Sequence, residues 1–451
     1  MHVGVIGSGI SGLASAWLLS PIHHVDVFEA GDHLGGHANT VDIRVDGQDL
    51  AVDTGFMVFN DRTYPNLLGM LGNLGLSSKR SRMSFSVQCG DEGLEWSSRR
   101  LVGVFSQPES LVRGGVWRML YDIARLSATA DRLLADGSLA DLTLGELLER
   151  EGYKGSFVDW YLVPMASSIW STPPGKVLDY PAESFIRFCD NHGLLHVLSK
   201  PSWQTIAGGA RGYVEQLARG VSGDLQLGVA AVRVERTADG PTVTFSDGTT
   251  RRFDTLVIGT HSDEALGLLA DPSPAEREVL GAIGYQPNTV VLHTDDTFLP
   301  ARRLARASWN YYAAECTLDA TDLSVTYYLN VLQQLPVKTP VLITVNPVRA
   351  PREDRVLRTF SYSHPVFGRD ALEAQRRIPE IQGERDTWYC GAWQRYGFHE
   401  DGLLSAVNLV ERFGVLPPWG PSREPSPGRT LVEPALGDVP VRESIPGLAE
   451  A

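Results

Sequence analysis

The chain has 451 residues, of which 43% are hydrophobic and 21% charged, so it is long enough for two folded domains and too apolar for a disordered or fibrous protein. Its formal net charge of −14 argues against a general nucleic-acid partner, because no basic stripe is available to neutralise phosphates. No run of 18 apolar residues occurs, which argues against a membrane-spanning helix.

Residues 1–29 have the pattern of a strand–turn–helix–strand unit. An apolar strand at 3–6 precedes the sequence GSGISG (7–12), and a helix at 11–20 and a second strand at 25–29 follow it. In such a unit the glycines allow a tight turn, close approach of a pyrophosphate and close helix packing, while the helix N-terminus faces the phosphates. An acid at the end of the second strand accepts hydrogen bonds from ribose hydroxyls. The unit predicts dinucleotide binding by Gly7, Gly9, Ile10, Ser11, Gly12, Glu29 and Ala30.

The rest of the chain alternates between strand-rich and mixed segments. Strands are expected within 41–59, around the turn Asp46-Gly47, then in a meander at 229–245, at 253–261, at 324–332 and at 340–346. A strand, a glycine-rich turn and a helix follow at 387–414. We therefore expect an α/β protein with a nucleotide-binding domain built from 1–80, 205–265 and 385–414, a second domain built from 81–204 and 266–384, and a loosely held tail at 415–451.

Four widely separated cysteines, Cys89, Cys189, Cys316 and Cys390, form no C-x-x-C motif. This spacing indicates neither a zinc site nor a disulfide framework, so we expect reduced thiols. The first residues lack the basic region of a signal peptide, and glycines interrupt their apolar run. We therefore expect a cytoplasmic protein, with the inner face of the membrane as a peripheral location.

The stretch EAGDHLGGHANTV (29–41) resembles the extended fingerprint of the flavin amine oxidase superfamily, which includes phytoene desaturases and protoporphyrinogen oxidase. In that family a second glycine pair carries the chain beneath the pyrophosphate. His37 stands where the family usually has arginine. The sequence YCGAWQRYGFHEDGLLSA (389–406) is similar to the family's closing motif, in which a helix N-terminus points at the isoalloxazine.

The resemblance implies FAD as the cofactor, held by a Rossmann-like domain of the GR2 type that is interleaved with an α+β substrate domain. The absence of a second GxGxxG motif disfavours NADPH as an obligate substrate. Beyond the first turn, the resemblance implies FAD contacts for Gly35, Gly36, His37, Thr54, Gly55, Phe56, Val232, Gly391, Gly402 and Leu403. No metal is expected, because His192 and His196 have no third ligand in the sequence pattern.

Several further stretches resemble one bacterial branch, whose members occur beside, or fused to, cyclopropane fatty acyl phospholipid synthases. One function in that branch is the aerobic desaturation of methyl-branched phospholipid acyl chains. The branch implies a lipidic substrate, oxygen as acceptor, and a methyltransferase or cyclopropane synthase as partner. The stretches are DTGFMVFN (53–60), TYPNL (63–67), NHGLL (191–195), GTHSDEALGLL (259–269) and GFHEDGL (397–403).

Two other functions stay open. The first is the oxidation of an amine or a porphyrin, for which Trp393 and Tyr396 would supply an aromatic cage near the flavin. The second is a flavin-binding partner of a lipid methyltransferase that has no turnover of its own. The candidates for chemistry are His399 in the closing motif, Lys200, which loosely matches a lysine that holds a water near flavin N5 in amine oxidases, and the cavity residues Asn60 and Tyr64.

The remaining features have two interpretations each. Asp53 is expected to be structural rather than a base, and a covalent flavin link to Cys390 is not expected. The aromatic block 157–174 is either a helical core face or the apolar wall of an acyl tunnel. A helix at 111–134 would place Val116, Leu120, Ile123, Ser127, Ala130 and Leu134 on one face. That helix either docks on its own domain or lies on an anionic membrane with its basic face and Trp117.

Overall fold

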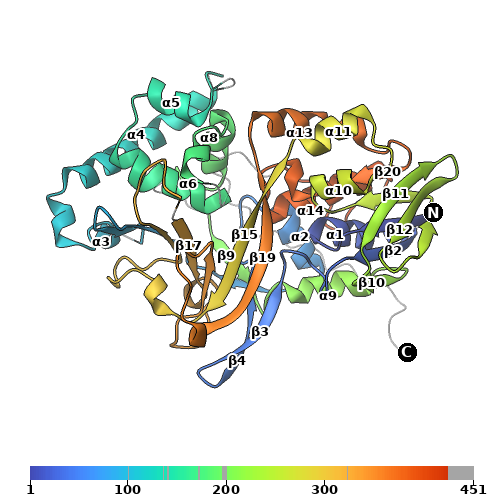
Figure 1. Cartoon of the computed structure of the whole chain (residues 1–451), viewed down its shortest axis with the longest axis horizontal. Helices are drawn as coiled ribbons and strands as arrows, with labels where there is room; N and C mark the ends of the chain where they lie inside the picture. Colours follow the sequence, from blue (N-terminus) through green and yellow to red (C-terminus); the bar gives the residue numbers. More distant parts are fainter. Residues whose placement is uncertain are drawn as a thin grey trace.

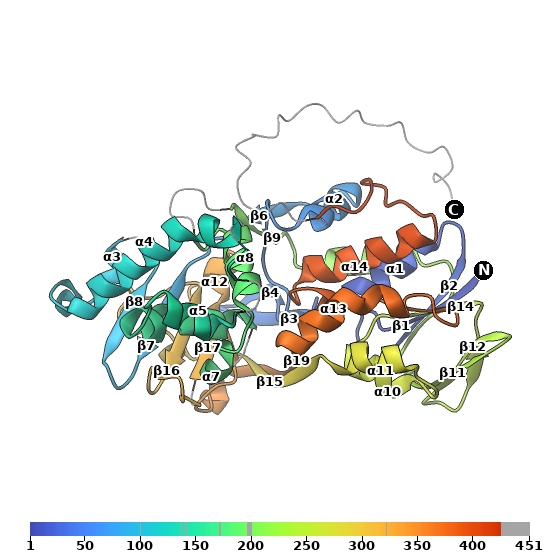
Figure 2. The same cartoon turned by 90° about the horizontal axis from the view of Figure 1, so that it is seen from above.

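The computed structural model describes residues 1–99, 101–135, 137–139, 142–170, 173–195, 201–321 and 323–424. The molecule is elongated, with a parallel sheet near one end and a helical lobe at the other (Figures 1 and 2). A long antiparallel pair of strands, β15 (Gly284–His293) and β19 (Val356–Val366), lies between the two ends. The predicted α/β fold is confirmed.

A five-stranded parallel sheet forms the nucleotide-type end. Its strands follow the order β10-β2-β1-β14-β20. Val25 and Val27 pack into the core on one face, while Phe28 packs into the core on the other, because successive side chains of a strand alternate. Parallel strands bring their carboxyl ends to one edge of the sheet. The strands are β1 (His2–Ile6), β2 (His24–Glu29), β10 (Leu225–Leu227), β14 (Thr255–Ile258) and β20 (Thr387–Tyr389).

Helices cover one face of this sheet and a small antiparallel sheet with three further helices covers the other (Figure 2). The first set is α1 (Ile10–Leu19), α2 (Pro65–Asn73), α9 (Arg211–Arg219) and α14 (His399–Arg412). The second set is β11 (Ala231–Thr237), β12 (Gly240–Phe245), β13 (Thr250–Arg252), α10 (Ser262–Leu268), α11 (Pro274–Gly281) and α13 (Arg369–Ile381). Although α11 and α13 lie in the segment 266–384 that was assigned to the second domain, Glu276 of α11 bonds to β11 and β20.

The second half consists of a seven-stranded sheet and the helical lobe. The sheet order is β19-β15-β18-β17-β16-β7-β8, with β7 (Phe85–Cys89), β8 (Leu94–Ser97), β16 (Trp309–Ala313), β17 (Leu323–Tyr328) and β18 (Leu342–Val345). The lobe contains α3 (Leu101–Val104), η1 (Pro108–Leu111), α4 (Gly114–Ala135), α5 (Leu144–Arg150), the π-helical turn η2 (Val158–Leu162), α6 (Val163–Trp170), α7 (Pro174–Val177) and α8 (Ala182–Asn191). Shorter pieces are α12 (Leu329–Leu332), η3 (Asp296–Phe298) and η4 (Glu353–Arg355).

Two smaller sheets join the halves. The hairpin β3 (Thr40–Val45) and β4 (Gln48–Asp53) turns at Asp46-Gly47, where both residues have positive φ, as the sequence predicts. The strands β5 (Phe59–Asn60), β6 (Ser78–Arg80) and β9 (Trp203–Ile206) form the other sheet in the order β5-β9-β6. This sheet brings the segment that follows the hairpin next to the segment that leads into α9.

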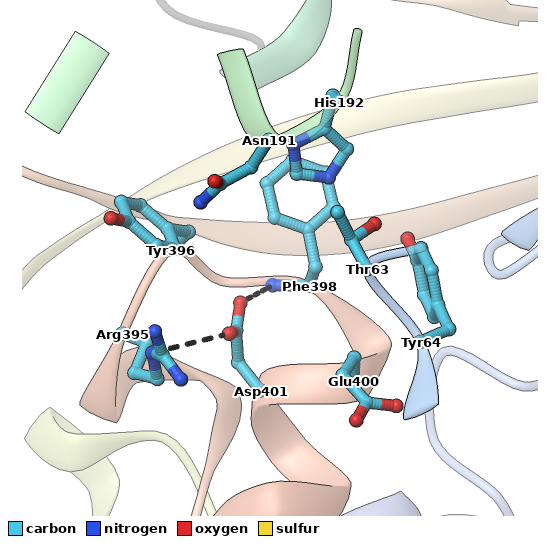
Figure 3. Close-up of a pocket in the computed structure, with 9 residues that line it drawn as sticks. All are labelled: Thr63, Tyr64, Asn191, His192, Arg395, Tyr396, Phe398, Glu400 and Asp401. Atoms are coloured by element: carbon cyan, nitrogen blue, oxygen red, sulfur yellow. Dashed lines mark hydrogen bonds and ion pairs between the residues drawn. The ribbon is translucent and has the colours of Figure 1, made fainter. Parts of the chain in front are cut away.

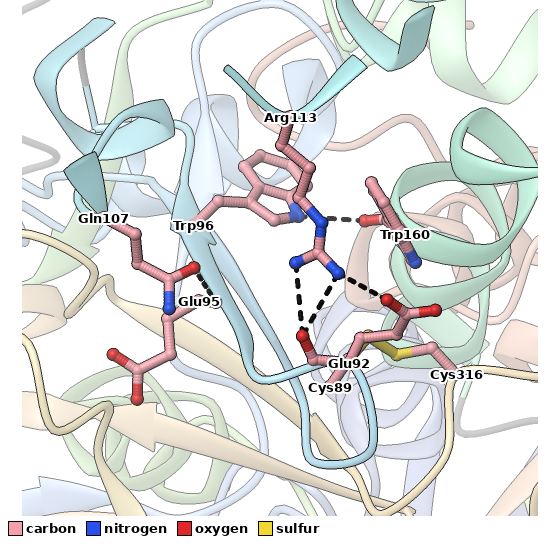
Figure 4. The surroundings of a disulfide bond; sticks show 8 residues. All are labelled: Cys89, Glu92, Glu95, Trp96, Gln107, Arg113, Trp160 and Cys316. Carbon is pink, nitrogen blue, oxygen red and sulfur yellow. Dashed lines mark hydrogen bonds and ion pairs between the residues drawn. A yellow bond between two sulfur atoms is a disulfide. The ribbon is translucent and has the colours of Figure 1, made fainter. Parts of the chain in front are cut away.

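A disulfide joins Cys89 and Cys316, so the prediction of reduced thiols is wrong for these two cysteines (Figure 4). Parallel pairing of β7 with β16 places Cys89 opposite Ala313, and the chain returns to it three residues later, with a Cα–Cα distance of 5.5 Å. The two cysteines are 227 residues apart in sequence, so no local pattern could indicate their pairing. Cys189 and Cys390 are free and buried.

Residues 415–424, the first part of the predicted tail, contact α1 and α2. The Trp419 ring stacks on Trp17 at 6.3 Å and lies against Gly69, and the Arg423 carbonyl accepts a hydrogen bond from Asn66 Nδ2 at 2.8 Å. The remainder of the predicted tail, 425–451, lies outside the described residues. Within the described part of the chain, no helix has both the length and the apolar character needed to cross a membrane.

Candidate functional site

The first glycine turn is shaped by backbone packing at two positions and left open at the third. Gly7 has a φ of +93°, which favours glycine, and a Cβ at Gly12 would lie 2.0 Å from the Gly7 carbonyl oxygen. A Cβ at Gly9 would meet nothing within 4 Å. Gly9 therefore borders open space at the N-terminus of α1, where the predicted pyrophosphate would lie.

Glu29 lies at the end of β2, directly beside this turn. Its Oε2 accepts hydrogen bonds from the Ser8 N–H at 2.9 Å and the Ser8 hydroxyl at 2.6 Å, and its Oε1 accepts one from the Gly31 N–H at 2.8 Å. These donors hold the carboxylate at the edge of the sheet where the parallel strands end. An acceptor in this position fits the ribose of a dinucleotide.

The second glycine pair lies against the first turn, as the resemblance implies. Gly35 and Gly36 both have positive φ, the Gly35 N–H donates to the Ser8 carbonyl at 3.0 Å, and a Cβ at Gly36 would lie 3.3 Å from the Gly9 Cα. The next residue, His37, is half-buried, and the loss of solvent around its ring lowers its pKa to about 3. Its Nε2 has no hydrogen-bond partner among the described residues, so a neutral imidazole nitrogen is left for a ligand.

Residues 54–56 run along the same loop. The Phe56 N–H donates to the His37 carbonyl at 2.8 Å, and a Cβ at Gly55 would lie 2.3 Å from that oxygen. The Thr54 hydroxyl contacts the Tyr362 hydroxyl at 2.8 Å. The loop is therefore packed tightly under the turn.

Asp53, at the start of this loop, is a structural junction. Burial raises its pKa to about 6. Its carboxylate accepts hydrogen bonds from the Thr40 hydroxyl at 2.5 Å, the Ala210 N–H at 2.9 Å and Gln333 Nε2 at 2.8 Å. These bonds tie β4 to β3, to α9 and to the segment after α12.

The C-terminal motif reaches the N-terminal turn. After β20, the Gly391 N–H donates to the Ser405 hydroxyl at 2.9 Å, and the turn η5 (Ala392–Gln394) leads into α14. A Cβ at Gly402 would lie 2.8 Å from Ile10 Cγ2 and 2.9 Å from Ser11 Oγ. Both ends of the described chain thus form one cradle, with Leu403 fully buried behind it. The open space at Gly9, the unpartnered His37 nitrogen and this close helix contact fit FAD.

His399 begins α14 and is held in one orientation. Its Nε2 lies 2.7 Å from the Tyr213 hydroxyl, and its ring stacks on Phe56 at 3.8 Å between centroids. Burial lowers the pKa of His399 to about 3 and raises that of Tyr213 well above its ordinary value. Both groups are therefore neutral at pH 7, and Nε2 of His399 either accepts from the phenol or donates to it, depending on the tautomer of the imidazole.

A pocket lies beside this helix N-terminus, between α8, α14 and the start of α2 (Figure 3). Burial raises the pKa of Glu400 to about 8, although its carboxylate accepts hydrogen bonds from the Asn66 and Leu67 N–H groups at 2.8 and 2.9 Å. Burial likewise raises the pKa of Asp401 to about 6, against an opposing interaction with Arg395 at 3.8 Å. The lining residues are Thr63, Tyr64, Asn191, His192, Arg395, Tyr396, Phe398, Glu400 and Asp401.

The other candidates for chemistry do not form one group in the structure. Tyr64 lines the pocket, whereas Asn60 closes a local turn by accepting hydrogen bonds from the Arg62 and Thr63 N–H groups at 2.9 and 2.8 Å. Lys200 lies outside the described residues. On β11, Val232 is 51% exposed, and its role in binding FAD stays a prediction.

Sequence reasoning missed Asn191 and Arg395 as pocket residues. In the sequence, NHGLL (191–195) indicates only a family resemblance, and His192 suggests only a metal pair with His196. His196 lies outside the described residues. His192 Nδ1 instead lies 3.0 Å from the Phe188 carbonyl oxygen, and burial lowers its pKa to about 4. Only tertiary packing brings α8 next to the closing motif, so no spacing rule would have found this group.

A Tyr213→Phe variant should lose about 1–3 kcal/mol of unfolding free energy, because the half-buried His399 Nε2 would lose its hydrogen-bond partner. Urea unfolding of the purified protein measures this cost. His399→Phe in the Tyr213→Phe background should cost less than in the wild type, since the hydrogen bond is already absent. Tyr121→Phe, at a residue that is 61% exposed, is the control. Equal effects of His399→Phe in both backgrounds would show that the two side chains do not interact.

Residues 10–316 match the family model described as flavin containing amine oxidoreductase. No curated protein matches the chain. Among solved structures, a conjugated-linoleic-acid-producing fatty acid isomerase from P. acnes is 17% identical, with a TM-score of 0.63 over 92% of this chain and 98% of that one. Cyclohexylamine oxidase from Brevibacterium oxydans is 16% identical, with a TM-score of 0.65 over 92% and 99%. Putrescine oxidase bound to putrescine is 14% identical, with a TM-score of 0.62 over 91% and 100%. At these identities, the solved structures show a common fold.

Proposed function

The chain belongs to the flavin-containing amine oxidoreductase family and is an FAD-dependent oxidoreductase, and from this premise we propose that its substrate is a fatty acyl chain carried by a phospholipid. In the proposed reaction two hydrogens leave adjacent carbons of the acyl chain, which becomes an alkene. Molecular oxygen is the acceptor and leaves as hydrogen peroxide. The family match supports a flavin-dependent oxidoreductase. The acyl substrate and oxygen as the acceptor are what we propose in addition.

The observation that carries this proposal is a continuous series of aromatic rings between the pocket and the aromatic block in the helical lobe. The Phe398 ring lies 5.1 Å from Phe188, which stacks on His192 at 4.0 Å and lies 4.7 Å from Trp170. His192 is neutral at pH 7 because burial lowers its pKa to about 4. A wall of uncharged rings suits an apolar chain better than a charged substrate.

The carboxylates of the pocket are already committed to other groups. Glu400 accepts from the backbone at the start of α2, and Asp401 lies beside Arg395 and accepts from the Phe398 N–H at 2.9 Å. A substrate ammonium group would therefore compete with these groups for either carboxylate. The fold shared with a fatty acid isomerase further supports a lipidic substrate.

Different groups of residues would hold the dinucleotide and shape the pocket. The turn at Gly9, the second glycine pair with His37, and Glu29 would hold the dinucleotide, while Gly402 allows α14 to pack against α1 at the other end of the cradle. When bound, FAD supplies the hydride acceptor. The buried aromatic rings exclude water from the pocket, and the first N–H groups of α14 favour negative charge near its N-terminus.

Amine oxidation is the second candidate. Two of the similar solved structures are amine oxidases, and Tyr396 lines the pocket as the cage hypothesis requires. Trp393, the other cage residue, instead donates its indole N–H to the Thr260 carbonyl at 3.3 Å and is 3% exposed. Of the two residues predicted to form the cage, Tyr396 lines the pocket and Trp393 does not.

Anaerobic mixing of the yellow protein with vesicles tests the proposal. We expect vesicles that contain methylated or unsaturated phospholipid to bleach the flavin absorbance, and lipid mass spectrometry to show products lighter by two hydrogens. A Gly9→Val variant serves as the control without FAD. Bleaching by a panel of polyamines but not by lipid would establish the second candidate instead. A flavin that stays oxidised with both would favour a binding partner without turnover.

A further inference from the structure

Exposed large hydrophobic side chains gather at the free end of the helical lobe. Of fourteen such residues in the described part of the chain, six lie between positions 101 and 121. We call this group the tip patch: Leu101, Val102, Leu111, Val112, Trp117 and Tyr121. It belongs to α3, η1 and the first turns of α4, at the end of the molecule farthest from the parallel sheet (Figures 1 and 2). Clustered exposed apolar groups mark interaction surfaces.

The tip patch is not the helix face that the sequence predicts. The buried stripe of α4 shares Val116 and Ala130 with the predicted face but is rotated away from its other four residues. The stripe consists of Val116, Met119, Asp122, Leu126, Ala130 and Leu133. Of the predicted face, Leu120 and Ile123 are half-buried and pack on the same core. The helix therefore docks on its own domain, and the outward-facing Trp117 and Tyr121 are left without a core to cover them.

The patch is held in place rather than loosely attached. The Trp117 indole N–H donates to the Leu111 carbonyl at 2.9 Å, and its ring lies 5.2 Å from Phe105. A Cβ at Gly115 would lie 2.5 Å from the Trp160 ring, so the start of α4 is fixed against η2. Because the side chains of this surface are already ordered, binding costs less conformational entropy.

Arginines surround the patch although the whole chain is acidic. Residues 99–132 contain six arginines and three acidic residues, in a chain with a formal net charge of −14. Arg99 is exposed. Arg118 is exposed and pairs with Asp122 at 2.6 Å, and the partly exposed Arg113 pairs with Glu92. One exposed acidic residue, Glu109, lies in η1. The neighbouring loop adds exposed Leu304, whose carbonyl accepts from the Ser97 hydroxyl at 3.0 Å, and exposed arginines at 302 and 303. An apolar centre with a basic rim is complementary to an anionic lipid surface.

We propose that the tip patch inserts into the surface of an anionic phospholipid bilayer. Leu111, Val112 and Trp117 enter the interface, where an indole is favoured. The exposed guanidinium groups of Arg99, Arg302 and Arg303 contact lipid phosphates. This inference goes beyond the proposed reaction, because it concerns where the enzyme is held and stands whether or not phospholipid is oxidised.

Flotation of the FAD-loaded protein with vesicles tests the inference. We expect binding to equimolar phosphatidylcholine and phosphatidylglycerol, with weaker binding to phosphatidylcholine alone and at high salt. The double variant Val112→Glu/Trp117→Ser should bind about tenfold more weakly, since it removes apolar contacts and adds a charge that the lipid repels. Ile22→Glu, at a residue that is 60% exposed near the parallel sheet, is the matched control and should bind like the wild type.

Each readout is separate from turnover. The flavin absorbance should be the same in all three proteins, and each should unfold in a single thermal transition, which shows that the patch variant is folded. Loss of the hydrogen bond from Trp117 to Leu111 should lower the midpoint of that variant only slightly. Brominated lipids should quench part of the tryptophan fluorescence of the wild type, and Trp117→Phe should remove that quenching. Equal flotation of the patch variant and the wild type overturns the inference. So does a wild-type dimer in light scattering that the patch variant converts to monomer, because the patch would then bind a second copy.

Discussion

A Gly9→Val variant should fold like the wild type but be colourless. The Gly9 φ of −59° and ψ of 173° are accessible to any residue, and a Cβ there would meet nothing within 4 Å, so the apo fold tolerates the side chain. The added methyl groups instead fill the space where the pyrophosphate meets the N-terminus of α1. We expect FAD affinity to fall by roughly 100-fold or more, which corresponds to about 3 kcal/mol. Flavin fluorescence during titration of the apoprotein measures it.

The neighbouring glycine provides the contrast. At Gly12 a Cβ would lie 2.0 Å from the Gly7 carbonyl oxygen, so Gly12→Ala should destabilise the fold itself by about 3 kcal/mol or more. Gly72→Ala, on a solvent-facing part of α2 with nothing within 4 Å, should leave both FAD binding and stability nearly unchanged. A yellow Gly9→Val protein with wild-type affinity would mean that FAD does not lie against this turn.

An Arg236→Met variant should lose about 3–5 kcal/mol of unfolding free energy. Arg236 and Glu276 form a bidentate ion pair whose side chains are both 0% exposed, with a second contact at 2.9 Å, and the Tyr389 hydroxyl donates to Glu276 at 2.5 Å. This group joins β11, α11 and β20. Removing the arginine leaves a buried carboxylate whose remaining cation is Arg385, at 3.7 Å from Glu276 Oε2. Urea unfolding at pH 7 measures the loss.

The pH dependence separates this cause from simple loss of packing. Burial alone would raise the pKa of Glu276, but hydrogen bonds from Arg236 and Tyr389 outweigh it and lower the pKa. The stabilisation is therefore present above the unfolded-state pKa of about 4.3 and is lost as pH falls through the folded-state value. In the variant, burial still raises the pKa of Glu276, but the hydrogen bonds from Arg236 that lowered it are gone. The carboxyl therefore takes up a proton at a higher pH than in the wild type. The difference in stability between variant and wild type should therefore shrink as the pH falls from 8 towards 5.

Two controls accompany this experiment. Arg233→Met breaks an exposed pair on the same strand, with Glu235, and should cost less than about 1 kcal/mol. Adding Glu276→Leu to Arg236→Met should restore much of the stability, because no unpaired charge then remains buried. A constant loss from pH 8 to pH 5, with no recovery in the double variant, would contradict the electrostatic explanation.

Features defined by neighbouring residues could be predicted from the sequence. The positive φ of Gly7 and the turn at Asp46-Gly47 follow from residue types that tolerate those conformations, and the strand at 253–261 follows from a short apolar run. Glu29 could be assigned because its spacing from the turn is set by one βαβ unit. Such features depend on interactions over a few residues or a single helix, so the local order of residue types is enough to predict them.

Contacts between distant segments depend on packing that the sequence does not display. The pairing of Cys89 with Cys316 follows from the parallel register of β7 and β16, and the pocket follows from the approach of α8 to α14. On α4, two apolar stripes overlap, and only the neighbours of the helix decide that Met119 and Leu126 are buried while Leu120 and Ile123 are half-buried. By itself, then, the sequence determined the dinucleotide turn, the α/β fold class and the flavoprotein family. The tertiary structure alone decided which side chains share the pocket and which apolar groups face the solvent, because burial depends on what each surface meets in space.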